Sequence, residues 1–336
     1  MIFVGGLAFS SSSEGYEDLL ILLEHPTLVS ATNCFKSIPE RKISFCASTS
    51  ERHSSLRHVY VFQREYATVN PSLVELVGTD EATTCVGLVV RNRKSGFTSV
   101  GHLDSPGLVD SGLSQMLSSV THEDVKAELD VHLIGGYEDA PYEHSGTNSE
   151  RSDGYSWGLC PKIIEALQDS ATIFHLQTLC LLRHNTQYSD GVALPIIRGF
   201  VVEPATGTMA PAIFDSSSRC PDEVLRRVRI TVSSEDVYWT GKLLETYDTD
   251  HDRFQIAPVS WHQEWKFTAS LLLQHSDSQM LIRCSTSPYA EAPDFVKSMR
   301  MTFSYLVRYP DWQTSFPNRQ PRVFKRIDNG GWEQCQ

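Results

Sequence analysis

The chain has 336 residues, of which 40% are apolar and 21% charged, a composition typical of a soluble globular protein. Its formal net charge is -12, and no dense basic run appears, which argues against a nucleic-acid partner. No apolar run approaches the roughly 20 residues that a membrane span needs, and the apolar residues 1–4 are too short for a signal peptide. We therefore expect a cytoplasmic protein that could also enter the nucleus, without a membrane partner.

Eight cysteines are scattered along the chain, and none of them forms a Cys-x-x-Cys pair. Structural zinc sites usually contain such close pairs, so we predict neither a metal nor another cofactor. Thiols stay reduced in the cytosol, and most should serve as small buried apolar side chains. At most one or two of these cysteines should carry chemistry.

The first predicted elements divide the chain near residue 55. Residues 1–55 are predicted to form an N-terminal arm with a helix over 16–23 and a polar loop over 48–55. Residues 56–336 are predicted to form the main domain. Its first strands are expected at 59–62, 85–90 and 97–102. A turn at 93–96 joins the last two strands, which indicates a hairpin.

Beyond the hairpin, helices and strands follow one another irregularly. In chain order, we expect a helix at 108–126, a strand at 129–134, a helix at 160–167, a strand at 173–181, two strands flanking the turn at 204–207, and a helix at 293–309. Residues 138–156 are rich in Gly, Ser and Asp and are predicted to form a mobile surface loop. This mixture favours the α+β class, as a layered sandwich of mostly antiparallel β-sheets with flanking helices.

Cys85 and His102 form the densest chemical signal. Cys85 opens one strand of the predicted hairpin and His102 ends the returning strand, so the two should meet at the same edge. The thiolate is the nucleophilic form of Cys, and the free thiol has a pKa of about 8.5, so a nucleophilic Cys needs a neighbouring base. The same spacing also fits a packed strand Cys and a solvated His, and it leaves both interpretations open.

Four segments resemble protein N-terminal asparagine amidohydrolases, and plant members in particular. They are GTDEATTC at 78–85, HLD at 102–104, VHLIGGY at 131–137 and STSPYAE at 285–291. The resemblance implies a cysteine amidohydrolase that converts N-terminal Asn to Asp with release of ammonia, feeding the N-degron degradation pathway. The implied partners are proteins or peptides that begin with Asn, together with arginyltransferase and other enzymes of that pathway.

A more distant similarity extends the implied site. Bacterial chemoreceptor glutamine deamidases and cytotoxic necrotizing factor toxins share a related Cys and His arrangement. In the chemoreceptor enzymes a Thr stands six residues before the Cys, and a Gly-Glu stretch lies upstream. Thr79 and Glu65 match these positions, although Arg64 replaces the Gly. The resemblance therefore implies a deamidase-like core in which Cys85 is the nucleophile, His102 the general base, and Thr79 the group that orients the imidazole.

An enzyme that recognises an N-terminal amine needs an anionic partner for it, because charge-assisted hydrogen bonds are the strong ones. The substrate-binding candidates are Glu65, Asp104, Asp80, Glu81 and Ser285. Each acid could equally be a surface or capping residue, and the serine could equally cap the following helix. Two other functions stay open: a broader Gln or Asn protein deamidase, and a non-catalytic adaptor that binds N-degrons.

Overall fold

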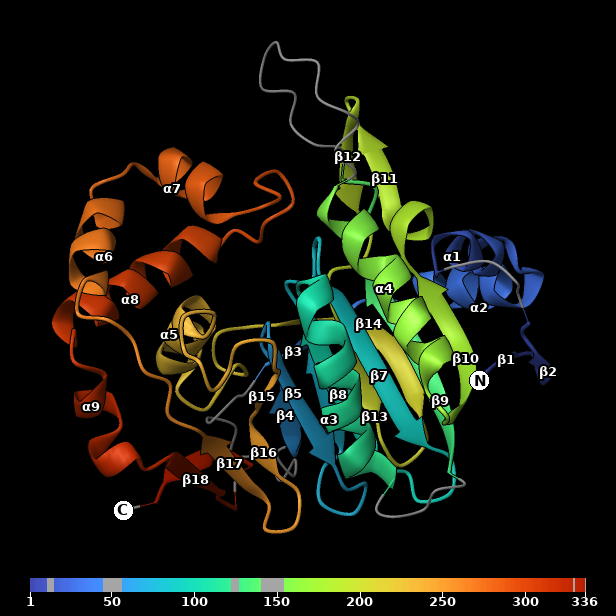
Figure 1. Ribbon diagram of the computed structural model, residues 1–336, viewed down its shortest axis with the longest axis horizontal. Helices are drawn as coiled ribbons and strands as arrows, with labels where there is room; N and C mark the ends of the chain where they lie inside the picture. The colour runs from blue at the N-terminus through green and yellow to red at the C-terminus, as the bar shows by residue number, and fades with distance from the viewer. Residues whose placement is uncertain (11–14, 45–55, 122–126, 140–153, 329, 336) are drawn as a thin grey trace.

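The computed structural model describes residues 1–10, 15–44, 56–121, 127–139, 154–328 and 330–335. Two β-sheets pack face to face, helices cover the outer face of the larger sheet, and a C-terminal group of helices lies to one side (Figure 1). This mixed α and β content, spread over several sheets, agrees with the predicted α+β class. Antiparallel pairings predominate, and a minority of the strand pairs are parallel.

The larger sheet has eight strands. In spatial order they are β15 (Leu244–Glu245), β5 (Glu65–Val69), β8 (Thr98–Leu103), β7 (Val86–Asn92), β9 (Glu128–Gly135), β10 (Ile173–Cys180), β1 (Ile2–Val4) and β2 (Leu7–Ala8). Strands β5, β8, β7 and β9 are antiparallel neighbours. The hairpin of β7 and β8 therefore lies inside the sheet, with both of its strands paired on both sides.

The second sheet has five strands and faces the first. In order they are β3 (Arg41–Ile43), β14 (Thr208–Phe214), β13 (Phe200–Glu203), β6 (Leu76–Thr79) and β4 (His58–Tyr60). A smaller sheet contains β16 (Tyr247–Asp248), β17 (Arg253–Ile256), β18 (Arg322–Arg326) and β19 (Trp332–Gln334), and β11 (Thr186–Ser189) pairs with β12 (Val192–Pro195) as a separate hairpin. Strand β6 ends at Thr79, six positions before Cys85.

The helices fall into two groups. Those on the side of the larger sheet are α1 (Gly15–Glu24), α2 (Pro26–Ser37), α3 (Val109–Thr121) and α4 (Tyr155–Asp169). Those of the C-terminal part are α5 (Glu223–Val232), α6 (Trp265–Leu273), α7 (Asp277–Cys284), α8 (Phe295–Arg308) and α9 (Trp312–Ser315). The segment between α7 and α8 returns from this second group toward the two sheets (Figure 1).

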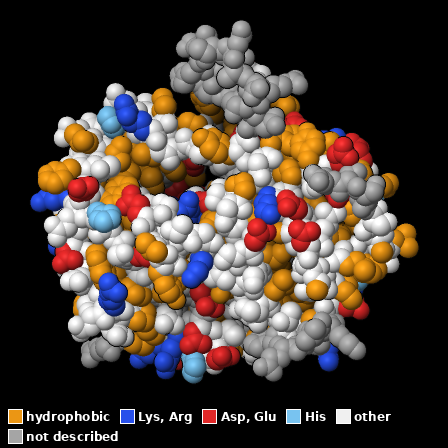
Figure 2. All heavy atoms as spheres, viewed as in Figure 1, with side chains coloured by type: hydrophobic (Ala, Val, Ile, Leu, Met, Phe, Trp, Pro, Cys, Tyr) orange, Lys and Arg blue, Asp and Glu red, His pale blue; other side chains and the backbone are white. Residues whose placement is uncertain are grey.

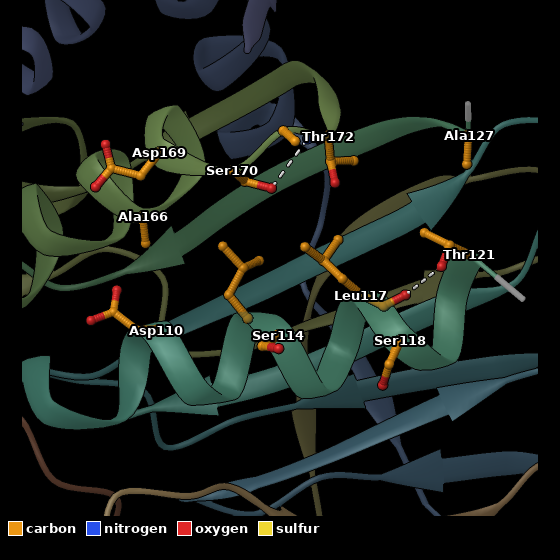
Figure 3. Close-up of a pocket in the computed structure, with 12 residues that line it drawn as sticks. Asp110, Ser114, Leu117, Ser118, Thr121, Ala127, Ala166, Asp169, Ser170 and Thr172 are labelled. Atoms are coloured by element: carbon orange, nitrogen blue, oxygen red, sulfur yellow. Dashed lines mark hydrogen bonds between the residues drawn. The ribbon is translucent and has the colours of Figure 1, made fainter. Parts of the chain in front are cut away.

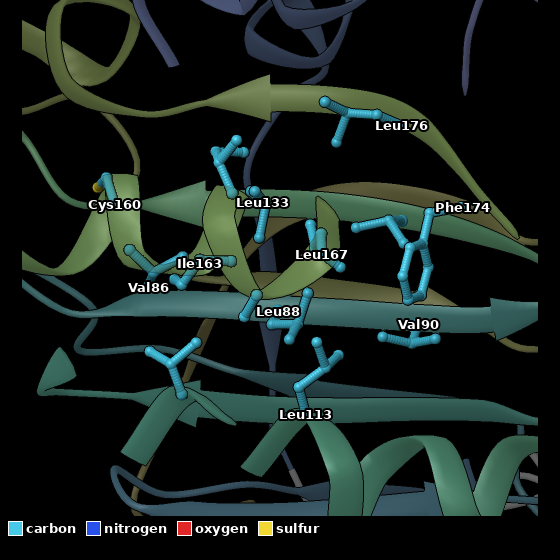
Figure 4. Packing of buried hydrophobic residues seen from close by; sticks show 14 of the residues in the cluster. Val86, Leu88, Val90, Leu113, Leu133, Cys160, Ile163, Leu167, Phe174 and Leu176 are labelled. Atoms are coloured by element: carbon cyan, nitrogen blue, oxygen red, sulfur yellow. The ribbon is translucent and has the colours of Figure 1, made fainter. Parts of the chain in front are cut away.

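Strand β7 separates two hydrophobic clusters. Val86, Leu88 and Val90 pack against α3 and α4 (Figure 4), whereas Val89 belongs to the cluster between the two sheets. Successive side chains of a strand point to opposite faces. Cys85, four positions before Val89, therefore faces the second sheet and not the helices.

The structure confirms most of the predicted elements and differs from the prediction at several places. The predicted hairpin is β7 and β8, but β7 begins at Val86, so Cys85 precedes the strand instead of opening it. Several elements were not predicted, among them α2, β5, β6 and α5. The polar loop at 48–55 lies outside the described residues, as does most of the loop predicted at 138–156, whose last two residues begin α4.

Candidate active site

The register of the hairpin brings the ends of β7 and β8 together. Gly87 lies opposite His102, and Val86 opposite Leu103. Cys85 precedes β7 on the face of Gly87, and His102 shares that face. The ring of Phe200 on β13 occupies the space where a side chain at Gly87 would lie, with only 2.3 Å between its nearest atom and an added Cβ. Cys85 and His102 thus lie between the two sheets at one edge.

His102 is held by Thr79 from the second sheet. Thr79 Oγ1 lies 2.7 Å from His102 Nδ1, and both side chains are buried. The Thr79 hydroxyl can also donate to the carbonyl of Asp80, 3.4 Å away, and when it does so it accepts from Nδ1–H of the imidazole. In that neutral tautomer Nε2 carries a lone pair. Nε2 is buried and has no hydrogen-bond partner among the described residues, which leaves it available as a base.

Burial keeps both members of the pair neutral. It lowers the pKa of His102 to about 4, against the opposing charges of nearby carboxylates. Burial also raises the pKa of the Cys85 thiol well above its usual value, and the carboxylates of Asp104 and Glu291 raise it further. The Thr84 hydroxyl and the Arg64 guanidinium act in the opposite direction. The thiolate form of Cys85 is therefore disfavoured in this environment.

The start of β7 is anchored by the end of β9. Gly136 N–H donates to the carbonyl of Cys85 at 2.7 Å. Gly135 adopts φ +125°, and a Cβ there would lie 2.4 Å from the carbonyl oxygen of Cys85. A larger residue at this position would push the two strand ends apart, so the glycine permits the close approach that fixes the backbone of Cys85.

Glu65 lies in an internal ion pair. Its carboxylate accepts from Arg226 of α5, with Nη2 to Oε2 at 2.6 Å, and from the N–H of Phe62 at 3.0 Å. Both charged side chains are fully buried. The structure therefore places this predicted substrate-binding residue beside α5, with its oxygens already occupied.

Asp80 and Glu81 are also paired with arginines. Asp80 accepts from the hydroxyl of Tyr60 at 2.6 Å and from Arg219 at 3.3 Å. Both oxygens of Glu81 accept from Arg227, at 2.9 and 3.0 Å, and Arg219 lies 2.9 Å from Oε1. These two acids belong to a charge network that joins the end of β6 to α5, and neither has a free oxygen.

Asp104 differs from the other three acids. Its Oδ2 accepts from Arg64 Nε at 2.6 Å and from Gln63 Nε2 at 2.7 Å. Its Oδ1 is buried and has no hydrogen-bond partner among the described residues. Asp104 directly follows β8, and its carboxylate is close enough to Cys85 for its charge to raise the pKa of that thiol. A buried acceptor without a donor is costly, so this position suits a ligand that brings a donor.

Ser285 leads to an acid that the sequence analysis did not select. Ser285 Oγ donates to Glu291 Oε1, and no hydrogen bond reaches Oε2 from the described residues. Burial raises the pKa of Glu291 to about 7. The only signal for Glu291 was its place at the end of the motif 285–291.

The segment that carries Glu291 is tied to the residues before Cys85. Thr286 Oγ1 lies 3.0 Å from Thr84 Oγ1, and the hydroxyl of Ser287 donates to Thr83 at 2.7 Å. The face of the molecule shown in Figure 2 has a hollow between the group of helices α6 to α8 and the part that carries α4, and charged side chains lie around this hollow. The segment between α7 and α8 is thereby fixed against the residues that precede β7.

Another groove lies between α3 and α4 and is separate from these residues. Its volume is about 610 Å³, with Asp110 and Asp169 at one end and Thr121 at the other (Figure 3). Within the described ranges, no group of three His, Cys, Asp or Glu side chains is arranged to hold a metal ion. No helix in the described part of the chain is long and apolar enough to cross a bilayer.

Comparison with known proteins identifies the family. The family model described as "Protein N-terminal asparagine amidohydrolase" matches residues 48–334. A relative of that name from Arabidopsis thaliana is 50% identical over the whole of both chains. Relatives of the same name from Sus scrofa and Homo sapiens are 30% and 28% identical, each covering 82% of this chain and 83% of its own.

These matches define an amidohydrolase, a class that hydrolyses carbon–nitrogen bonds other than those of the peptide backbone. The chain belongs to the protein N-terminal asparagine amidohydrolase family. The resemblance stated from the four sequence segments, including the likeness to plant members, is confirmed.

Proposed function

We propose that this chain hydrolyses the side-chain amide of N-terminal Asn in proteins and peptides, giving N-terminal Asp and ammonia. One observation carries the proposal: His102 is held by Thr79 with Nε2 free, at the edge where Cys85 precedes β7. The relatives named for this activity support the same reaction here. The reaction needs no cofactor, and its product would enter N-degron degradation in the cytoplasm or nucleus, with arginyltransferase as the next enzyme.

The chemistry follows from a deamidase-like core with a cysteine nucleophile. His102 Nε2 takes the proton of the Cys85 thiol, and the thiolate attacks the carboxamide carbon of the substrate. Backbone N–H groups near Cys85 stabilise the oxyanion, each donor contributing about 3 kcal/mol. His102 then protonates the departing ammonia and leaves a thioester. Water, deprotonated by the same imidazole, attacks the thioester and releases Asp and the free thiol.

The α-ammonium of the substrate is assigned to Glu291 and Asp104. Their free oxygens are Oε2 and the buried Oδ1, and both carboxylates lie close enough to Cys85 for their charge to raise the pKa of its thiol. An ammonium bound there would offset that charge and favour the thiolate. Glu65, Asp80 and Glu81 are less suited to this role because arginines occupy their oxygens. Ser285 would act by holding Glu291.

The test uses ammonia release from short peptides. A peptide that begins with Asn should be deamidated, and the same peptide with an acetylated amine should not. The matched Gln peptide should react more slowly, because one methylene in a pocket changes binding by about 1–3 kcal/mol. Turnover of the acetylated peptide would favour a broader Gln or Asn protein deamidase. Binding of the Asn peptide without any ammonia release would favour a non-catalytic adaptor.

Thr79→Val should lower kcat by about tenfold to a hundredfold while leaving KM near its original value. Val has the shape of Thr but no hydroxyl, so Nδ1–H of His102 would lose the one acceptor that the described residues give it, and an unpaired buried donor costs about 1–3 kcal/mol. Steady-state ammonia release measures the effect. Thr79→Ser keeps the hydroxyl and is the matched control. If the serine variant is as slow as the valine variant, the hydrogen bond has no catalytic role.

Glu291→Gln should change the pH dependence of kcat/KM. Because burial raises the pKa of Glu291 to about 7, the group is neutral below that pH and no longer attracts an ammonium, so kcat/KM should fall as the pH drops through 7. Above roughly pH 8 the peptide amine loses its own proton. Initial rates across pH 5–9 should therefore show a maximum between these limits.

The Gln variant should lose the acidic limb near pH 7. Its kcat/KM should be lower by about tenfold to a hundredfold, mainly through KM, since a hydrogen bond to a charged group contributes about 1.5–3 kcal/mol. Glu203→Gln, at the exposed end of β13, is the control and should keep the wild-type profile. If Glu291→Gln kept the acidic limb, the fall of kcat/KM below pH 7 would be due to a group other than Glu291.

A further inference from the structure

Arg64 has a backbone conformation that an arginine rarely adopts. It lies directly before β5 with φ +61°, in the left-handed region. For residues with a side chain this region is disfavoured, whereas glycine enters it freely. A strained residue persists only where its surroundings hold it, and such residues concentrate at functional sites. The contacts of Arg64 show what holds it.

The backbone of Arg64 is fixed on both sides. Its N–H donates to the carbonyl of His102 at 2.9 Å, and its carbonyl accepts from the N–H of Leu244 at 2.8 Å. Arg64 therefore links β15 to the strand that carries the proposed general base. A residue of any type in this backbone conformation could make these two hydrogen bonds. They therefore explain the conformation at position 64, but they do not explain why the residue is an arginine.

The side chain of Arg64 supplies that explanation. Nε donates to Asp104 Oδ2 at 2.6 Å, and Nη1 reaches Ser233 Oγ at 3.4 Å. The side chain of Arg64 is 24% exposed, and that of Asp104 is 7% exposed. One residue thus holds His102 through its backbone and Asp104 through its side chain, on either side of Leu103.

Charges from several elements face the pair of Cys85 and His102. Asp104, Glu291 and Arg64 act on Cys85, whereas Asp104, Glu81 and Glu65 act on His102. Glu65 and Glu81 have their own arginines on α5, and Glu291 has the hydroxyl of Ser285. Arg64 is the arginine that is bonded to Asp104 itself. Its charge therefore balances the carboxylate that directly follows β8.

We propose that Arg64 is a positioning residue for the reaction, which fixes His102 through its backbone and holds the Asp104 carboxylate, with its charge balanced, beside Cys85. This inference rests on the proposed roles of Cys85 and His102. Among the described residues, Arg64 hydrogen-bonds to Asp104, to Ser233 and to the backbone of His102 and Leu244, so it acts on the pair of Cys85 and His102 through Asp104 and through the strand end that carries His102.

The charge balance can be measured without turnover. Iodoacetamide reacts with the thiolate of a cysteine, and mass spectrometry of the peptide containing Cys85 gives its alkylation rate at pH 8, with the exposed Cys34 as internal reference. Arg64→Gly removes a positive charge without adding strain, and should slow alkylation by about threefold to tenfold. Asp104→Asn removes a negative charge and should accelerate it by a similar factor.

The double variant Arg64→Gly with Asp104→Asn should return to near the wild-type rate, and Arg64→Lys should stay close to it. Arg93→Gly is the matched control, because Arg93 pairs with Asp130 at the other end of the same sheet. Changes of the same sign in both single variants, or a double variant as slow as Arg64→Gly, would overturn the proposal. Alkylation needs no substrate. If the protein were inactive on Asn peptides, the proposed function would be refuted, but the alkylation rates of the single and double variants would still test the role of Arg64.

Discussion

Cys85→Ala should abolish ammonia release from a peptide that begins with Asn. The variant removes the sulfur atom that would form the thioester, and Cys160, another described cysteine close to the start of β7, belongs to the cluster on the helix side of the sheet. Loss of a nucleophile in a hydrolytic site lowers kcat by factors on the order of 10⁴ or more. Ammonia should therefore fall to the level of a blank without enzyme, and mass spectrometry should detect no thioester.

Cys180→Ala is the matched control for this loss. Cys180 is buried at the end of β10 and belongs to the cluster between the sheets. Its replacement removes a similar sulfur from the same core, so it should reduce stability modestly while retaining turnover. If Cys85→Ala still released ammonia at the wild-type rate, another residue would be the nucleophile. If Cys180→Ala were as inactive as Cys85→Ala, the loss would reflect damage to the core.

The hairpin could be predicted from sequence because its information is local. Seventeen positions separate Cys85 from His102, and a single turn joins the two strands, so alternation alone puts their ends together. Thr79 is different, because it lies on the facing sheet and was selected only by resemblance. Nothing in its own strand predicts a contact with His102, since that contact depends on how the two sheets pack.

The substrate-binding acids show why sequence alone was insufficient. Glu65, Asp80 and Glu81 are close to Cys85 along the chain, but the arginines that occupy them lie about 140 to 160 positions further on. Glu291 is 206 positions from Cys85 and reaches the site through the packing of the C-terminal helices. Local sequence patterns do not predict such distant pairings. The several arginines of the short helix α5 did indicate that this helix has acidic partners.

Helix α2 was missed for a different reason. It begins at Pro26, a residue that sequence reasoning treats as a helix breaker, but proline is favoured in the first turn because its missing N–H would have no partner there. Its buried residues are only Leu28, Thr32 and Phe35, which is a weak apolar pattern. The spacing of these three positions is helical, so the signal was present but slight.

The ion pair of Arg226 and Glu65 should give the largest effect on stability. Arg226 bonds to both oxygens of Glu65 and to the carbonyl of Tyr60 at 2.6 Å. Its guanidinium lies 4.5 Å from the ring centre of Phe62 and 4.4 Å from that of Phe254. Without Arg226, the buried Glu65 carboxylate would lose these hydrogen bonds and keep only Arg229, at 3.7 Å, as a nearby cation. Arg226→Met should therefore lower the free energy of unfolding by about 3–5 kcal/mol, measured by urea denaturation.

Arg229→Met tests whether this effect is due to pairing or merely to burial. Arg229 lies three positions further along α5 and is equally buried, but its three guanidinium nitrogens have no hydrogen-bond partner among the described residues. It approaches Glu65 only to 3.7 Å, and burial lowers its pKa to about 10. With Arg229 gone, Glu65 and Arg226 would remain as a neutral pair, so this variant should be near neutral or stabilising. A loss equal to that of Arg226→Met would mean that both arginines stabilise the fold through packing, and that the hydrogen bonds of Arg226 contribute little.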